Sequence, residues 1–571
     1  MGPPTAHVGL AGCLAAGVAL GLGYALLVPF GEKPDEPSHM ARIVYEARYG
    51  HTPAVSGAPV FPNIVTYEAV QPPVYYRVAA QVVRLLPPVA WSISPARFFG
   101  CVEQSRRFVL DGAADPPLQV LVLRLAGLGF AVGSALCVFS AAGTLGAAPS
   151  NAVLASVLSL LTPQVLFVST GVTNDGLALL AGSLILWSAL RAGVRGSAFC
   201  ALAAGGISAL AVGVKLNTAP YLLGAPLLIA GGRPRWLARI LALFLAGVAF
   251  AAAPAFLGHP WHDGPDQRGL VERVTLPAAS VASKDYVGLL PGLLTSYWAK
   301  YGWMDLEPPG GVRVIWLVIL VLATLGWVLR APTAGLRWLP LWLVLASAVA
   351  GWMLTLGTSN QVQGRFLLPF AGVIALLLAR GIGVLPVRAL PFLVAIAIVG
   401  ANVMSLYHLH AAYRPARWPA DMVIDAQQCY ADRIVLETLS GGAELGQTFF
   451  GIREGLSAID VVFTGTALAS DTIRMVIADA ATGHIFREAF VSCRDIRPEH
   501  YTRFRFAPVR KSDQRLLRFS LEMVGADPDG SLSLRFALGD PYLEGVRLVD
   551  GLSRDGDLKF VAWTDKVREV E

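Results

Sequence analysis

Long apolar runs separated by shorter polar stretches occupy most of the chain as far as residue 406. They cover residues 8–30, 118–141, 151–168, 177–190, 198–214, 219–229, 237–257, 314–329, 339–356, 366–379 and 390–406. Most are near the ~20 residues that a helix needs to cross a bilayer. The pattern predicts an α-helical polytopic membrane protein with about eleven transmembrane helices. Residues 198–229 also fit one broken helix followed by a re-entrant piece.

Beyond residue 406 the pattern changes from long apolar runs to alternation. Apolar and polar residues alternate in residues 459–464, 472–478, 501–506, 516–523 and 531–536. A period of two, interrupted by Gly, Asp and Pro, is typical of antiparallel strands. Short strands at this spacing favour a sandwich or jelly roll. We therefore expect a transmembrane domain in residues 1–406 and an all-β domain in residues 407–571.

Composition supports the membrane assignment. The chain of 571 residues is 55% hydrophobic and only 15% charged, whereas soluble domains carry about 25% charged residues. No Lys or Arg precedes the first apolar run, which favours a retained span over a cleaved signal peptide. The six cysteines lack the spacing of a zinc site. Cys429 and Cys493 both lie in the tail, where they could form a disulfide or remain buried free thiols.

The positions of the arginines predict the orientation. Four short connections contain Arg and neither Asp nor Glu, near residues 191–195, 233–239, 330–337 and 380–388. The positive-inside rule makes these connections cytoplasmic. With an odd number of spans, the N-terminus is then cytoplasmic and the tail is outside. The first outer loop, residues 31–117, and the other polar groups discussed below share the outer side, which indicates a chamber open away from the cytoplasm.

Acidic residues follow the first span directly. Asp35 lies where this span would leave the lipid, and we interpret it as a general base. Glu36 beside it would raise the pKa of one member of the pair, or the two would bind a divalent cation such as Mg²⁺ or Mn²⁺. His39, four residues on, could orient the carboxylate or contact a substrate. The alternative is a solvated helix end, broken by Pro34 and Pro37, with His39 at the surface.

Cations and amides at other span ends are candidates for substrate binding. Arg365, preceded by Gln363, is suited to bidentate contact with a phosphate, and Lys215 could add a point charge. For both cations the alternative is interfacial snorkelling. Asn174 and Asp175 begin a span, where both are good capping residues. Capping fits Asn174 best, and Asp175 could also line the chamber.

A polar and aromatic tract in the first outer loop could bind a carbohydrate. Residues 67–76 offer a carboxylate, an amide and three phenols, from which we select Glu68, Gln71, Tyr75 and Tyr76 as candidate acceptor-binding residues. Residues 73–86 read as an amphipathic helix with valines on its apolar face, either lying on the membrane surface or packed as an ordinary loop helix.

Several motifs together resemble one known family. They are residues 34–39 (PDEPSH), 71–76 (QPPVYY), 173–175 (TND), Lys215, 363–369 (QGRFLLP), 446–449 (GQTF) and 556–560 (GDLKF). In this order the set resembles the bacterial membrane family catalogued as domain of unknown function 2142, which is similar to the GT-C class of membrane glycosyltransferases. One departure is Phe366, where that family often has Tyr.

The resemblance implies an enzyme of the bacterial plasma membrane. It would transfer a sugar from a polyprenyl-phosphate carrier to a cell-envelope glycan or lipid acceptor on the extracytoplasmic face, and Asp35 occupies the place of the GT-C catalytic base. A metal would be optional. We expect membrane lipids as surroundings and no nucleic-acid partner. Two other classes stay open: a transporter or flippase for lipid-linked glycans, and a non-catalytic glycan-binding assembly subunit.

Overall fold

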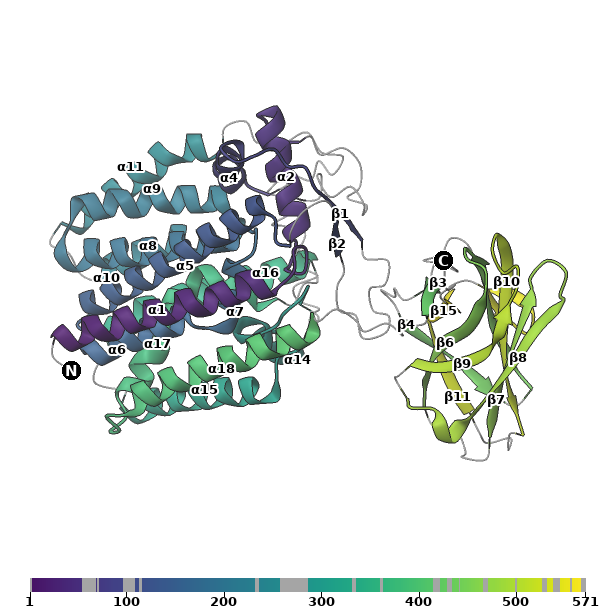
Figure 1. Cartoon of the computed structure of the whole chain (residues 1–571). Helices are drawn as coiled ribbons and strands as arrows, with labels where there is room; N and C mark the ends of the chain where they lie inside the picture. The colour runs from purple at the N-terminus through teal and green to yellow at the C-terminus, as the bar shows by residue number, and fades with distance from the viewer. Residues whose placement is uncertain are drawn as a thin grey trace. The chain divides into compact units, whose positions relative to one another are not determined.

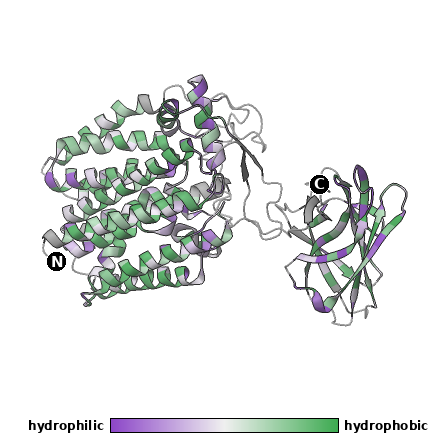
Figure 2. Ribbon diagram, viewed as in Figure 1, coloured by the Kyte–Doolittle hydropathy of each residue, from purple (hydrophilic) through white to green (hydrophobic). Residues whose placement is uncertain are grey.

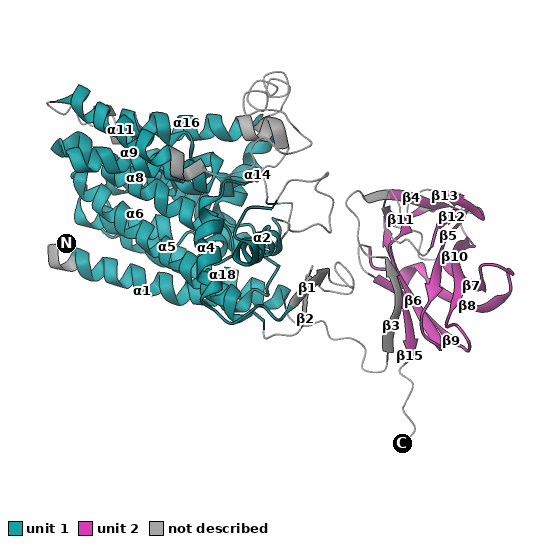
Figure 3. Cartoon of the chain, turned by 90° about the horizontal axis from the view of Figure 1, so that it is seen from above, with its two compact units in different colours: residues 1–94, 108–413 teal, residues 95–107, 414–571 magenta. Residues whose placement is uncertain are grey.

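The chain divides into two compact units in a computed structural model: residues 1–94 with 108–413, and residues 95–107 with 414–571 (Figure 3). The structure describes residues 3–53, 68, 71–95, 108–111, 115–231, 236–256, 286–304, 306–330, 335–359, 363–413, 422–428, 434–440, 442–465, 471–498, 501–525, 531–537, 545–554 and 557–565. Cys429 lies outside the described residues, and Cys493 is a free thiol. The first unit is mainly helical and the second is built of β-strands.

The first unit contains helices packed side by side, most of them apolar (Figure 1; Figure 2). They are α1 (Pro3–Leu27), α2 (Glu36–Tyr49), α4 (Val74–Arg84), α5 (Leu118–Thr144), α6 (Pro149–Leu160), α7 (Pro163–Ser169), α8 (Asp175–Arg195), α9 (Ala198–Val214), α10 (Tyr221–Gly231), α11 (Leu237–Phe256), α14 (Tyr286–Trp298), α15 (Gly310–Arg330), α16 (Gly335–Ser359), α17 (Ala371–Gly383) and α18 (Leu390–Ala412), with two 3₁₀ helices, η1 (Leu216–Thr218) and η3 (Gly364–Phe370). Strands β1 (Ser92–Pro95) and β2 (Phe108–Asp111) pair as a small sheet.

Each of the eleven expected apolar runs coincides with one or more of these helices, which confirms a polytopic helical fold. Within the described ranges, six helical segments have the length and hydropathy to cross a membrane, and the pair α6 and α7, bent by 51°, makes a seventh. The remaining apolar runs form shorter helices, in α9, η1 with α10, α11 and α16. The structure adds α14, an apolar helix between the expected runs at residues 237–257 and 314–329.

The second unit is a two-sheet β-sandwich. Its strands are β3 (Met422–Gln428), β4 (Ile434–Ser440), β5 (Glu444–Gly451), β6 (Leu456–Thr464), β7 (Thr472–Asp479), β8 (Ile485–Ser492), β9 (Tyr501–Val509), β10 (Arg515–Val524), β11 (Ser531–Ala537), β12 (Arg547–Val549), β13 (Leu552–Arg554), β14 (Asp557–Leu558) and β15 (Phe560–Asp565), with the 3₁₀ turn η4 (Cys493–Asp495). One sheet has the order β13-β12-β5-β10-β7-β8, and the other β14-β11-β6-β15-β3 with β4 beside β11 and β9 beside β6.

The alternating pattern of the tail produces the core of this sandwich. Phe449 and Phe519 point inward from one sheet and pack on Phe560 of the other, with ring centroids 5.5 and 5.4 Å apart. All three side chains are fully buried. Because side chains alternate between the two faces of a strand, each second residue reaches this layer.

Helix α4 confirms the expected helix near residues 73–86 but packs through a different face. Tyr75, Tyr76 and Val83 are buried, whereas Val78, on the expected apolar face, is 54% exposed. The tyrosines decide the orientation because their rings and hydroxyls have partners inside the unit, as described below. Val78 and Leu85 therefore lie on its outward side, whereas Val74 and Val82 pack partly against the core.

Candidate functional site

Asp35 occupies a strained position at the start of α2. The helix begins at Glu36, with Pro37 in its first turn. Asp35 is the N-cap residue with φ 59° and ψ 6°, the left-handed conformation that non-glycine residues seldom adopt. Its side chain makes no capping hydrogen bond, although Asp is a preferred cap. Backbone strain of this kind gathers at functional sites, and here it turns the carboxylate away from its own helix.

The carboxylate of Asp35 pairs with a guanidinium 330 residues along the chain. The Nη2 of Arg365 donates to Oδ2 of Asp35 at 2.5 Å, and its Nε donates to Oε1 of Gln363. Both charged side chains are mostly buried, with Asp35 18% and Arg365 6% exposed. The structure thus brings together Asp35, Arg365 and Gln363, three of the residues that the sequence singled out.

Close backbone packing holds the segment that carries Arg365. A Cβ atom at Gly364 would lie 2.3 Å from the backbone nitrogen of Tyr297 in α14. At Gly182 in α8 it would lie 1.9 Å from the carbonyl oxygen of Pro369. Only glycine permits these approaches. Two glycines therefore allow η3 to pack tightly between α8 and α14. This packing fixes the backbone position from which the Arg365 side chain extends.

A second group of polar side chains links α2 to α4. The hydroxyl of Tyr76 donates to Oε2 of Glu68 at 3.2 Å and lies 2.7 Å from Nδ1 of His39. His39 and Tyr76 also stack, with ring centroids 5.7 Å apart. The ring of Tyr75 also makes an edge-on contact with the ring of His39. Because His39 follows Asp35 by one helical turn, both side chains project toward the same space.

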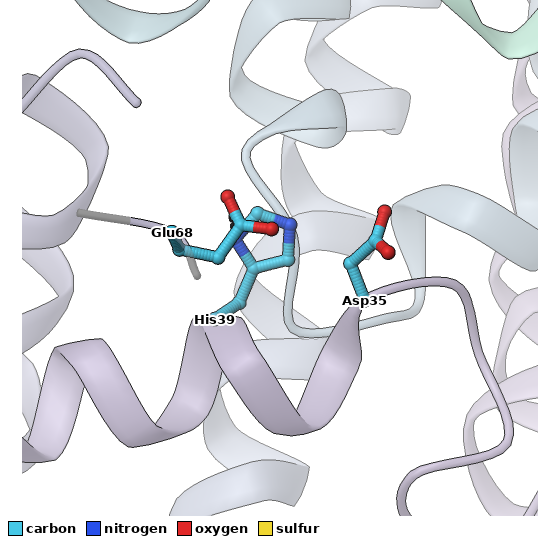
Figure 4. Close-up of side chains that lie close together, drawn as sticks. All are labelled: Asp35, His39 and Glu68. Atoms are coloured by element: carbon cyan, nitrogen blue, oxygen red, sulfur yellow. Dashed lines mark ion pairs between the residues drawn. The ribbon is translucent and has the colours of Figure 1, made fainter. Parts of the chain in front are cut away.

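Asp35, His39 and Glu68 form the one metal-compatible group found in the described ranges. Each offers one ligand atom, and these atoms all lie within 4.8 Å of one another (Figure 4). Two carboxylates and an imidazole suit a divalent cation such as Mn²⁺. The set differs from the Asp35 and Glu36 pair that the sequence suggested. Glu68 takes the place of Glu36.

Glu36 faces away from Asp35 and is occupied by other partners. Its two carboxylate oxygens accept hydrogen bonds from Nε and Nη2 of Arg124 at 2.8 and 2.7 Å. They also accept the backbone N–H groups of Val172 and Gly31, both at 3.0 Å. Successive helical residues point in different directions, so adjacency in sequence does not make the two carboxylates neighbours. These contacts give Glu36 a structural role and leave it no place in the metal-compatible group.

Lys215 and Asp175 form another buried ion pair. The Nζ of Lys215 lies 2.6 Å from Oδ1 of Asp175. Lys215 and Arg365 both lie against the ring of Phe366, at 5.7 and 5.6 Å from its centroid. The two cations therefore belong to one site. Asn174 does not cap α8 as we expected, because its side chain donates instead to the carbonyl of Val214 at 3.2 Å.

Two buried arginines support the site and were missed in the sequence. Arg124 of α5 donates to the carbonyls of Ala25, Val28 and Pro29 as well as to Glu36, which ties the end of α1 to α2. The signal that could have revealed Arg124 is a charged residue inside an apolar run.

Arg42 supports the Glu68 side of the site. Its Nη1 donates to the carbonyls of Glu68 and Gln71, and its guanidinium stacks on the ring of Tyr76 at 3.6 Å. Its ion pair with Glu46, four residues on in α2, was the available signal. Gln71 thus enters the site region through its backbone carbonyl.

The charges around Asp35 and Glu68 shift their pKa values in opposite directions. Burial opposes ionisation of Asp35, but the positive charges of Arg365 and Lys215 outweigh it and hold its pKa below the usual value. Burial, followed by the charge of Asp35, raises the pKa of Glu68 to about 8. Burial also lowers the pKa of His39 to about 3. At neutral pH the site contains an ionised Asp35, a protonated Glu68 and a neutral His39.

Comparisons with known proteins give distant structural similarity. No family model matches the chain, and no curated protein sequence matches it. The chain is similar to arabinosyltransferase EmbB from Mycobacterium smegmatis, with a TM-score of 0.35 and 12% identity over 91% of this chain and 64% of EmbB. It is also similar to ArnT from Cupriavidus metallidurans bound to undecaprenyl phosphate, with a TM-score of 0.33 and 14% identity over 68% of this chain and 77% of ArnT. The resemblance to the domain of unknown function 2142 family stays a prediction.

Replacing Arg124 by Met is expected to destabilise the first unit strongly. Both Arg124 and Glu36 are fully buried, and removing one partner of such a pair costs about 3–5 kcal/mol. We expect a lowered Tm in thermal unfolding of the purified protein. In the double variant Arg124→Met with Glu36→Gln, part of the loss should return because no unpaired charge remains. An unchanged Tm in Arg124→Met would contradict the structural role of this pair.

Glu68 is expected to make stability fall as the pH rises. Its pKa is 4.5 in the reference state and about 8 in the folded protein, so between these values the folded chain retains a proton that the unfolded chain releases. Its contribution to the free energy of unfolding is complete below pH 4.5 and is lost as the pH rises through 8. Glu68→Gln imitates the protonated acid, so it lacks this dependence.

Thermal unfolding with chelator present, at several pH values from about 5 to 9, measures the effect. The Tm of the native protein should fall relative to that of Glu68→Gln toward high pH. A constant difference between the two would refute the assignment of a protonated Glu68.

Proposed function

We propose that this chain is a membrane glycosyltransferase that transfers a sugar from a polyprenyl-phosphate carrier to a cell-envelope glycan or lipid acceptor. The observation that carries the proposal is the meeting of Asp35, Arg365, Lys215 and Asp175 at one end of the apolar helices. Charged groups buried in a membrane domain mark substrate sites. The site combines a carboxylate base with two cations suited to a phosphate.

In the proposed reaction the Asp35 carboxylate takes the proton of the acceptor hydroxyl. The acceptor oxygen attacks the anomeric carbon of the donor sugar, and the bond from that carbon to the carrier phosphate oxygen breaks. The carrier phosphate leaves with the bonding electrons. Arg365, with Lys215, stabilises the charge that develops on it. Attack opposite the leaving group inverts the anomeric configuration.

The remaining residues orient the reacting groups. Tyr76 holds His39 and Glu68, and Arg42 holds the backbone on which Glu68 lies. Tyr75 contacts His39, and we assign these groups to the acceptor side. Glu36 with Arg124 fixes the start of α2 and so the position of Asp35. We place this site on the extracytoplasmic face of the bacterial plasma membrane, following the positive-inside rule.

A divalent cation fits the group of Asp35, His39 and Glu68 by donor type and spacing. If bound there, Mg²⁺ or Mn²⁺ would supply positive charge for an anionic substrate. Removal of divalent cations with EDTA is then expected to lower transfer, and adding Mn²⁺ to restore it. His39→Ala should raise the Mn²⁺ concentration needed for half of the effect by about tenfold or more. Transfer that is insensitive to EDTA would argue against the cation and leave the base mechanism in place.

The direct test of the proposed function uses the purified full-length protein in detergent. It is incubated with a panel of polyprenyl-phosphate sugars and an envelope-glycan extract, and release of the polyprenyl phosphate is measured by mass spectrometry. We expect release that depends on the acceptor. Absence of release with every donor, for a folded protein, would overturn the proposal. A transporter would instead move the lipid-linked sugar across liposomes without cleaving it, and a binding subunit would retain glycan without turnover.

A further inference from the structure

We propose that the carrier phosphate binds by displacing Asp35 from Arg365, so that donor binding itself frees the base. The inference rests on the proposed function and adds an order of events to it. Its starting point is that both cations of the site are already neutralised by carboxylates: Arg365 pairs with Asp35, and Lys215 pairs with Asp175. A phosphate that enters the site therefore competes with these carboxylates for the two cations.

The geometry favours Asp35 as the carboxylate that leaves. Its side chain is 18% exposed, whereas that of Asp175 is 1% exposed. Asp175 is also the first residue of α8, in a regular helical position. Asp35 instead lies in the strained left-handed conformation ahead of α2, where a change of backbone angles releases strain. Exchange at Lys215 would require the almost fully buried carboxylate of Asp175 to leave its ion pair with Lys215.

Arg365 is prepared to keep its position during the exchange. Its Nε donates to Gln363, and the backbone on either side is wedged between α8 and α14. When Asp35 leaves, the Nη2 that bound it can donate to a phosphate oxygen instead. One anion replaces another on the same guanidinium, so the buried cation stays paired at each stage.

The exchange couples the two halves of the reaction. With Asp35 on Arg365, the carboxylate oxygen Oδ2 is engaged by the guanidinium. After the phosphate has taken that place, Asp35 is free to accept a hydrogen bond from the acceptor hydroxyl. His39 and Glu68 each offer a polar atom within 4.8 Å of a carboxylate oxygen of Asp35. The donor therefore binds first, and its phosphate releases Oδ2 of the base.

The test measures binding of undecaprenyl phosphate to the purified full-length protein in nanodiscs, with EDTA present, by microscale thermophoresis. Asp35→Asn removes the competing charge, so the affinity is expected to rise by about tenfold. Asp35→Gly is a second variant, because glycine adopts the left-handed conformation without strain and so protects the fold. Asp175→Asn makes the same change of charge at the other pair and serves as the matched control, with a smaller rise expected.

A double-mutant cycle separates exchange on Arg365 from a general effect of charge. In the Arg365→Ala background, Asp35→Asn should no longer raise the affinity. The inference is overturned if Asp35→Asn and Asp35→Gly bind with unchanged or weaker affinity while the native protein binds, and also if the gain persists without Arg365. If no form of the protein binds undecaprenyl phosphate, the proposed donor class fails with it.

Discussion

Asp35→Asn is expected to lower the rate of sugar transfer by about 10²–10⁴-fold, the range that positioned general bases contribute. The amide keeps the shape of the side chain and tolerates the left-handed backbone of residue 35, so the fold should be retained. It cannot accept the proton of the acceptor hydroxyl. The measurement is the transfer rate of purified protein at saturating donor, with the Tm recorded alongside.

The same substitution elsewhere provides the control. Asp513 is an exposed aspartate of the β-sandwich, and Asp513→Asn should transfer sugar at the native rate. Full activity of a folded Asp35→Asn protein would remove the base from the mechanism. An activity lost together with the Tm would be tested with Asp35→Gly, which keeps the backbone conformation.

Arg365→Ala is expected to lower kcat/KM for the lipid donor by about 10²–10³-fold, the usual effect of removing one group that stabilises developing charge. The KM for the donor should rise, since the guanidinium contacts the phosphate in the ground state as well as in the transition state. Arg365→Lys keeps the charge but loses the planar guanidinium, so its activity should lie between that of the native protein and that of Arg365→Ala. Steady-state kinetics at several donor concentrations measure both parameters.

A variant of the neighbouring cation, Lys215, serves as a control that separates loss of phosphate binding from loss of structure. Lys215→Met removes a charge that lies against the same Phe366 ring, and we expect a smaller effect because Lys215 is held by Asp175. If Arg365→Ala retains the native KM and kcat while Lys215→Met does not, the phosphate lies at Lys215 and the assignment is reversed.

Part of the site could be predicted from the sequence because its signals are local. Asp35 was recognisable as an acid between two prolines where the first apolar run ends, and in the structure α2 begins directly after it, at Glu36. Arg365 and Lys215 were recognisable as cations at the ends of apolar runs. The prediction that Glu36 acts with Asp35 rested on adjacency, and the direction of its side chain depends on Arg124, 88 residues away.

The sequence by itself determined the kinds of element, namely apolar helices, a β domain of alternating strands and a set of polar residues at helix ends. These follow from periodicity, which the nearest neighbours in the chain impose. Only the tertiary structure decided that Asp35 meets Arg365, that Glu68 joins His39 and that Glu36 turns to Arg124. Such partners lie on different helices, and their pairing depends on how close the backbones approach at positions such as Gly182 and Gly364, which no local pattern records.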